Sequence, residues 1–308
     1  MKFNEYLKSC RENIGFTQEQ LAHGLYAFDS DNFTSIDSNT LSKWERGVIK
    51  PKIERQVNII RYFQKETGLA LPCWHEYSVE EAEKLICKTG MQNLLGKSKE
   101  LILDFPENKI SLDNLEVYQL RNSEMLDSAI KLHMDLDQTY NHGTTRVEAS
   151  TFREWALYPS NSFFYCEYLG HFFGLLFTVK LKQESFEKMM RCEIQEKDLT
   201  FDDFASFDEI GSNYIFSFFA MNQKASSMLF IRYYAHLIVN QTKIKEVGVA
   251  TMMDDVKKLI ESISLKYFDS LPLKEGVVLK TYRENLADFL SSEKVIKMIF
   301  SQQTCPEE

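Results

Sequence analysis

The sequence contains few of the residues that mark fibrous, low-complexity and disulfide-built proteins. Only 12 glycines and 6 prolines occur in 308 residues, which excludes collagen-like and proline-rich chains. The six cysteines form no C-x-x-C pair and no zinc-ligand spacing, so we expect reduced thiols and no metal site. The two most apolar runs, 162–179 and 214–239, are interrupted by charged residues such as Glu167 and Arg232. These absences predict a cytoplasmic globular protein without a membrane span.

The chain is acidic, but its charge is unevenly distributed. The net charge is −9, whereas residues 1–70 hold ten Lys/Arg and nine Asp/Glu and are nearly neutral. Hydrophobic residues make up 44% of the chain and aromatic residues 13%, which is enough for a substantial core. The length predicts two domains. Because nucleic-acid binding depends on the local potential, a near-neutral N-terminal module on an acidic body can still contact phosphates.

The N-terminal part has the apolar periodicity of a small helical domain. The spacing predicts helices over 3–14, from Thr17 onward, over 38–46 and over 53–64. Thr17 and Gln20 fit a capping box. In the segment 38–46, Leu41 and Trp44 share an apolar face, and the opposite face is polar. A helix of this kind suits the major groove, where base edges are read by hydrogen bonds.

Two short runs carry a resemblance to a known family. Residues 17–22 read TQEQLA and residues 40–47 read TLSKWERG, with Pro51 beyond. Together they resemble the phage-repressor-like (Cro/C1, xenobiotic-response-element) helix-turn-helix family. The resemblance implies a DNA-binding domain over 1–68, with an insertion at about 27–35 and a structural role for Glu45. It also implies these DNA contacts: Gln18, Ser38, Asn39, Thr40, Ser42, Lys43, Arg46, Lys50 and Lys52.

The remainder of the chain predicts a different architecture. Residues 69–112 are interpreted as a helical linker, with helices at 78–88 and 91–103. Over 113–308 we expect strands at 115–120, 163–167, 174–182, 214–221, 246–251 and 277–281. The helices expected there are 123–136, 226–239, 254–268 and 285–299. The predicted fold class is therefore α plus α/β, with an all-α helix-turn-helix domain joined by the linker to a mixed α/β domain.

The order of elements over 115–300 resembles the GCN5-related acetyltransferase (acyl-CoA N-acyltransferase) fold. In that family a glycine-containing loop between a strand and a helix cradles a pyrophosphate. The corresponding loop here, 222–227, has no glycine. The resemblance gives acyl-CoA as the candidate ligand, with these contacts: Gln223, Lys224, Ala225, Ser226 and Ser227. Asp208, Glu209 and Tyr282 were considered for catalysis, but no catalytic residue is assigned.

These observations lead to one main functional hypothesis and two alternatives. The main hypothesis is a sequence-specific transcriptional regulator that reads double-stranded DNA with helix 38–46 and whose acyltransferase-like domain is non-catalytic. It would bind an inverted repeat as a homodimer and could respond to a small-molecule effector. The first alternative is an active acyl-CoA-dependent N-acyltransferase that carries a DNA-targeting domain. The second is an antitoxin-like autorepressor that binds a protein partner.

Overall fold

The protein folds into two compact units. The computed structural model describes residues 1–86, 110–111, 114–120, 124–140, 147–253, 256–273 and 276–300. The first unit comprises the described residues of Met1–Leu94, Tyr234–Gln241 and Leu286–Glu308, and the second those of Leu95–Tyr233 and Thr242–Asn285. Neither unit is continuous in sequence. The division predicted from the sequence, 1–68, 69–112 and 113–308, stays a prediction.

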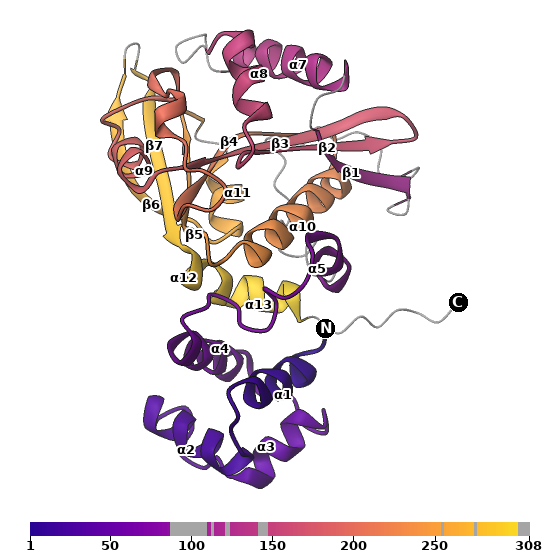
Figure 1. The fold of residues 1–308 in the computed structure, drawn as a ribbon, viewed down its shortest axis with the longest axis vertical. Coiled ribbons are helices and arrows are strands. Elements are labelled where there is room, and N and C mark those ends of the chain that lie inside the picture. The colour runs from indigo at the N-terminus through magenta and orange to yellow at the C-terminus, as the bar shows by residue number, and fades with distance from the viewer. Residues whose placement is uncertain are drawn as a thin grey trace. The chain divides into compact units, whose positions relative to one another are not determined.

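The first unit is built from helices (Figure 1). The helices expected at 3–14, 38–46 and 53–64 are present, and the Thr17–Gln20 capping box is formed. The predicted insertion lies between α2 and α3, where Phe33 is buried and the Asp29 carboxylate accepts from Asn32 and Asn58. The helices are α1 (Phe3–Asn13), α2 (Gln18–Phe28), α3 (Ser38–Glu45), α4 (Ile53–Thr67), α5 (Val79–Leu85), α12 (Leu286–Ser291) and α13 (Glu293–Ile299).

Residues 286–300 complete the core of this unit. The ring of Phe300 packs against Phe3, Tyr6 and Trp74 at centroid distances of 5.3, 4.9 and 6.3 Å. The Gln64 amide donates to the carbonyl of Ala287 at 2.9 Å. The single helix predicted over 285–299 is two helices, because Ser292 breaks the run and caps α13.

The second unit contains a seven-stranded sheet in the order β1-β2-β3-β4-β5-β7-β6. All neighbouring strands are antiparallel except β4 and β5, which are parallel. The strands are β1 (Leu115–Gln119), β2 (Ser162–Tyr168), β3 (His171–Leu181), β4 (Gly211–Ala220), β5 (Ile244–Thr251), β6 (Lys266–Pro272) and β7 (Val278–Asn285).

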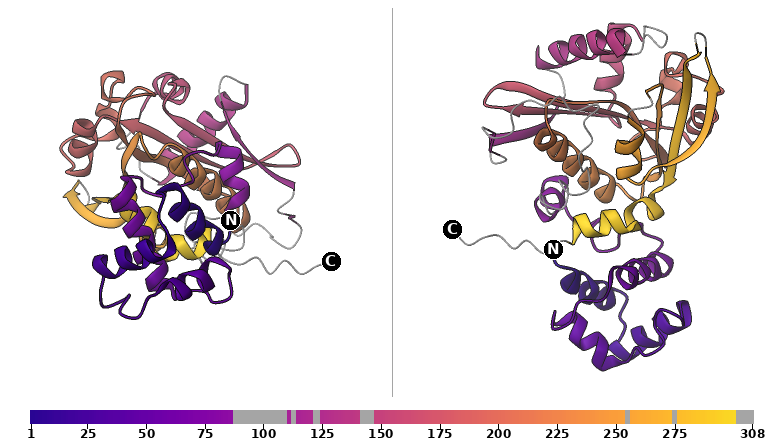
Figure 2. Two further views of the ribbon diagram at one scale, coloured as in Figure 1. Left: turned by 60° about the horizontal axis from the view of Figure 1, so that its bottom comes forward. Right: turned by 180° about the vertical axis from the view of Figure 1, so that it is seen from behind.

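Helices cover both faces of this sheet (Figures 1 and 2). On one face lie α7 (Glu124–Tyr140), α8 (Ala149–Leu157) and α9 (Gln183–Met190), which share one apolar cluster with β2, β3 and β4. On the other lie α10 (Gln223–Val239) and α11 (Lys257–Ser262), because right-handed crossovers from β4 to β5 and from β5 to β6 advance in the same direction. A side chain at Gly248 of β5 would meet Met190 and Phe186 of α9 at 2.8 Å, so glycine permits this packing.

Several element predictions for this unit are corrected. The predicted helix 254–268 ends at Ser262, and Lys266–Pro272 form strand β6. Ser264 has a φ of 71°, which ends helical geometry before the segment pairs with β7. Helices α8 and α9 were not predicted, nor were two short 3-10 helices, Glu196–Asp198 and Phe201–Asp203. The predicted helix 91–103 lies outside the described residues.

Candidate functional site

The parallel strands β4 and β5 stop pairing before β4 ends. The last pair is Ile215 with Val249, whereas β4 continues to Ala220. The same part of β4 carries a β-bulge: Phe177 of β3 pairs with Ser217 and Thr178 pairs with Ile215, so Phe216 is an extra residue. Beyond Ile215, β4 therefore has β3 on one side and an open backbone edge on the other. The end of the parallel pairing creates the opening in the sheet that the site uses.

A cavity of about 180 Å³ occupies this opening. Its walls include Ile215–Phe219 of β4 and residues 249–253, from the end of β5 onward. Helices α7, α10 and α11 and the segment 194–196 also contribute. The other lining residues are Val147, Met189, Tyr214, Val256, Ile263 and Leu279. Most of the lining side chains are apolar, and all lining residues belong to the second unit. The polar side chains on its wall are His133, Gln195, Glu196, Tyr214, Ser217 and Thr251.

His133 of α7 contributes an imidazole side chain to the wall of this cavity. Its ring stacks on Phe152 of α8, with centroids 4.4 Å apart and an interplanar angle of 22°. Its Nδ1 lies 2.8 Å from the Ser217 hydroxyl, and the tautomer decides which group donates. The stacking and the hydrogen bond fix the ring plane.

Glu196 provides a carboxylate on the same wall. The buried Tyr214 hydroxyl donates to its Oε1 at 2.6 Å. Burial, together with the negative charge of Glu196, holds the pKa of Tyr214 well above its ordinary value. Tyr214 is thus kept as a hydrogen-bond donor and orients the carboxylate. The cavity consequently presents one carboxylate and one imidazole to whatever enters it.

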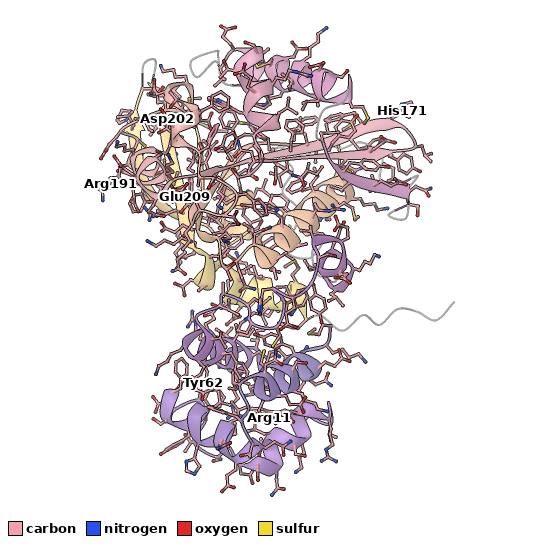
Figure 3. The ribbon with its side chains drawn as sticks, in the orientation of Figure 1. Arg11, Tyr62, His171, Arg191, Asp202 and Glu209 are labelled. Carbon is pink, nitrogen blue, oxygen red and sulfur yellow. The ribbon has the colours of Figure 1, made fainter. Side chains whose placement is uncertain are left out.

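Neither of these groups was assigned from the sequence, because each depends on packing. His133 reaches Ser217 across 84 positions of the chain, and the helix that stacks against it was not predicted. Glu196 belongs to a 3-10 helix of three residues, which is too short for a periodic signal. Asp208 and Glu209, the candidate bases from the sequence, are exposed and do not line the cavity. Glu209 is labelled in Figure 3. Tyr282 is buried and also lies outside the lining.

The predicted acyl-CoA loop forms the first turn of α10. The side chain of Asn222 caps the helix by accepting from the Ala225 amide at 2.9 Å, and its carbonyl accepts from the Ser226 amide. The side chains of Ala225, Ser226 and Ser227 are buried. Gln223 and Lys224 are partly exposed, and the Lys224 ammonium donates to the carbonyl of Ile110. A ligand phosphate would therefore meet this turn at Gln223 and Lys224.

The predicted DNA contacts lie on α2, on α3 and just after α3. Leu41 and Trp44 are buried as expected, and most of the predicted contacts are exposed. Gln18 instead donates to Glu45 at 2.9 Å. Glu45 is 8% exposed, and its Oε1 also accepts a hydrogen bond from the Nε of Arg11 at 2.6 Å. Arg11 is labelled in Figure 3. Glu45 therefore has the structural role expected of it. Whether the other side chains touch DNA stays untested, as do the predicted homodimer and effector.

Two further findings concern the described residues alone. No described helix has both the length and the apolar character required to cross a bilayer. Within the same residues, no group of three or more His, Cys, Asp or Glu side chains is placed to hold a metal ion.

No protein-family model and no curated protein sequence matches the chain. Solved structures resemble it over part of its length. FeeM, an N-acyl amino acid synthase from uncultured soil microbes, has a TM-score of 0.41 at 12% identity and covers 57% of this chain and 93% of its own. An N-acetyltransferase from Staphylococcus aureus Mu50 has a TM-score of 0.35 at 9% identity, covering 56% and 97%. An agmatine N-acetyltransferase has a TM-score of 0.37 at 10% identity, covering 56% and 99%.

These comparisons correct the main functional prediction. The three structures named above are enzymes of N-acylation, each of which covers just over half of this chain, and neither family models nor sequences support a repressor-like domain. The hypothesis of a DNA-binding transcriptional regulator is therefore wrong, and acyl transfer, kept as an alternative, is better supported. The repressor-like pattern covers only about 65 N-terminal residues, whereas the cavity lies in the second unit.

Proposed function

We propose that the second unit is an N-acyltransferase that moves an acyl group from a thioester to an amine. The observation that carries this proposal is the open edge of β4 inside a cavity that also presents Glu196 and His133. Acyl transfer to an amine needs a place for an extended donor, a group that attracts the amine and a base that takes its proton. The cavity supplies all three.

The open edge of β4 suits the arm of a pantetheine thioester. That arm is extended and carries two amides, so it can pair with a strand edge as an added strand would. The backbone of residues 216–220 lacks a strand partner on the β5 side. Coenzyme A and acyl carrier proteins carry the same arm. Because the first turn of α10 offers a phosphate only Gln223 and Lys224, we expect the arm, more than the pyrophosphate, to determine donor binding.

Glu196 and His133 divide the work on the acceptor. The Glu196 carboxylate, held by Tyr214, attracts the positive charge of the incoming ammonium. The ammonium first releases one proton to solvent and becomes a neutral amine. His133 then removes a second proton from the attacking amine as the C–N bond forms and the C–S bond breaks. The same imidazolium then returns that proton to the departing thiolate. The products are an amide and a free thiol, so the released thiol reports each turnover.

The first experiment measures thiol release with a disulfide dye. Octanoyl-CoA is supplied with a panel of primary amines, in parallel with octanoyl carrier protein, to tell the two donors apart. Substituting His133→Gln should lower kcat/KM by roughly 100-fold or more, because a positioned base contributes about that much. Glu196→Gln should mainly raise KM for the amine. The matched controls are His171→Gln and Glu193→Gln, whose side chains are exposed (Figure 3).

Three outcomes decide the proposal. Thiol release that depends on an amine and is lost in His133→Gln but not in His171→Gln supports it. An unchanged rate in both His133→Gln and Glu196→Gln contradicts the assigned roles. Absence of amine-dependent thiol release with every donor and acceptor contradicts the function itself.

A further inference from the structure

From the lining of the cavity we infer that the acyl group is an unbranched medium-length chain of about six to eight carbons, rather than acetyl. This inference rests on the proposed function, since it names the donor that the same site takes. It depends on how the polar and apolar walls are separated and on the size of the cavity.

The two faces of the sheet contribute different walls. His133 and Glu196 belong to the face that carries α7, α8 and α9. Helix α11 and the residue before it, on the opposite face, contribute only aliphatic side chains, from Val256, Leu259 and Ile260, and Ile263 follows. The rings of Phe218 and Phe230, whose centroids are 5.0 Å apart, extend the same apolar wall. An acyl chain whose thioester carbon lies near His133 and Glu196 would therefore place its tail among α10 and α11.

The volume sets the length of that tail. An engineered cavity of about 150 Å³ lined by Leu, Ile and Phe binds benzene, which has six carbons. The cavity here measures about 180 Å³ including its polar wall, and its wall at α10 and α11 has a similar lining, so that part would hold a tail of six to eight carbons at most. An acetyl group would leave most of the apolar wall without contacts, which forfeits dispersion energy. Met252 and Met253 at the end of β5 provide adaptable side chains around the chain.

Burial of methylenes predicts a steep dependence on chain length. Each buried CH₂ contributes a factor of roughly four in affinity. Hexanoyl adds four methylenes to acetyl, so kcat/KM should rise by about 250-fold between these donors. Beyond eight carbons the gain should stop, and dodecanoyl should react more slowly than octanoyl.

The test is a series of acyl-CoA donors of two to twelve carbons, with the best acceptor from the amine panel. Binding of the same donors is measured by calorimetry without acceptor. Ile260→Phe should move the optimum to shorter chains by at least two carbons, because the ring fills the apolar end. Ile263→Ala should move it to longer chains. Lys258→Ala is the matched control, since this residue of α11 is exposed and lies outside the cavity lining.

The outcomes separate this inference from the proposed function. Thiol release that is fastest with acetyl, or equal for all lengths, overturns the inference and leaves the function standing. Preferential binding of six- to eight-carbon donors without any turnover supports a chain-binding site and contradicts the function. A length optimum that is the same in Ile260→Phe and in the control overturns the placement of the tail against α11.

Discussion

The two units use polar side chains in opposite ways. In the first unit, Glu45 is enclosed by Arg11 and Gln18, and these groups satisfy one another. In the second, the Ser217 hydroxyl lies 2.8 Å from His133 Nδ1, the Tyr214 hydroxyl donates to Glu196, and both His133 and Glu196 line a cavity. A closed network contributes to folding, whereas polar groups that line a cavity can contact a ligand. The difference agrees with the proposal that acyl transfer takes place in the second unit.

The largest expected effect on stability comes from breaking the network of Glu45, Arg11 and Gln18. Arg11→Ala would leave the buried Glu45 carboxylate without its ion pair, so we expect a loss of about 3 kcal/mol in the free energy of unfolding. Urea denaturation followed by circular dichroism measures this loss. Lys8→Ala is the control, because Lys8 is exposed and its ion pair with Glu12 lies at the surface. If Arg11→Ala were as stable as Lys8→Ala, Glu45 would not depend on Arg11.

An intermediate effect is expected at Tyr214. Tyr214→Phe removes the donor to Glu196, and a hydrogen bond to a charged group contributes roughly 1.5–3 kcal/mol. We expect a loss near the lower limit, because the cavity can admit water to the carboxylate. Expressed as free energies, the rise in KM for the amine should exceed the loss of stability. Steady-state kinetics measures the KM, and thermal denaturation measures the stability. A variant that loses stability but keeps its KM would make Tyr214 a structural residue only.

The smallest effect concerns acid stability of the second unit. The Arg283 guanidinium donates to both oxygens of Glu187 and thereby holds the pKa of that carboxyl below its ordinary value. The folded state thus binds fewer protons than the unfolded state, so this stabilisation is present above about pH 4.3 and is lost as the pH falls further. The change should be below about 1 kcal/mol, because the pair is partly exposed. Denaturation midpoints at pH 6 and pH 3 measure it, and Glu187→Gln should show a flatter dependence.

Much of the architecture could be predicted from local pattern. Apolar runs at 163–167 and 214–221 predicted strands, and the capping box at Thr17 marked the start of α2. Strand β6 was missed because it is an edge strand with exposed Tyr267 and Phe268 next to a helix-like apolar spacing. The site could not be predicted at all. It depends on the bulge at Phe216 and on contacts between segments far apart in sequence, for which a single sequence has no periodic signal.

The contribution of residues 286–300 to the first unit has a consequence for the order of events during synthesis. Helices α1 to α5 are translated long before Phe300, whose ring covers Phe3, Tyr6 and Trp74. Until then their apolar surface remains uncovered and prone to association with chaperones or other nascent chains. Every described strand of the sheet precedes Leu286 in the sequence, so the second unit can fold before residues 286–300 complete the core of the first. The helices made earliest are therefore the ones that reach their final packing last.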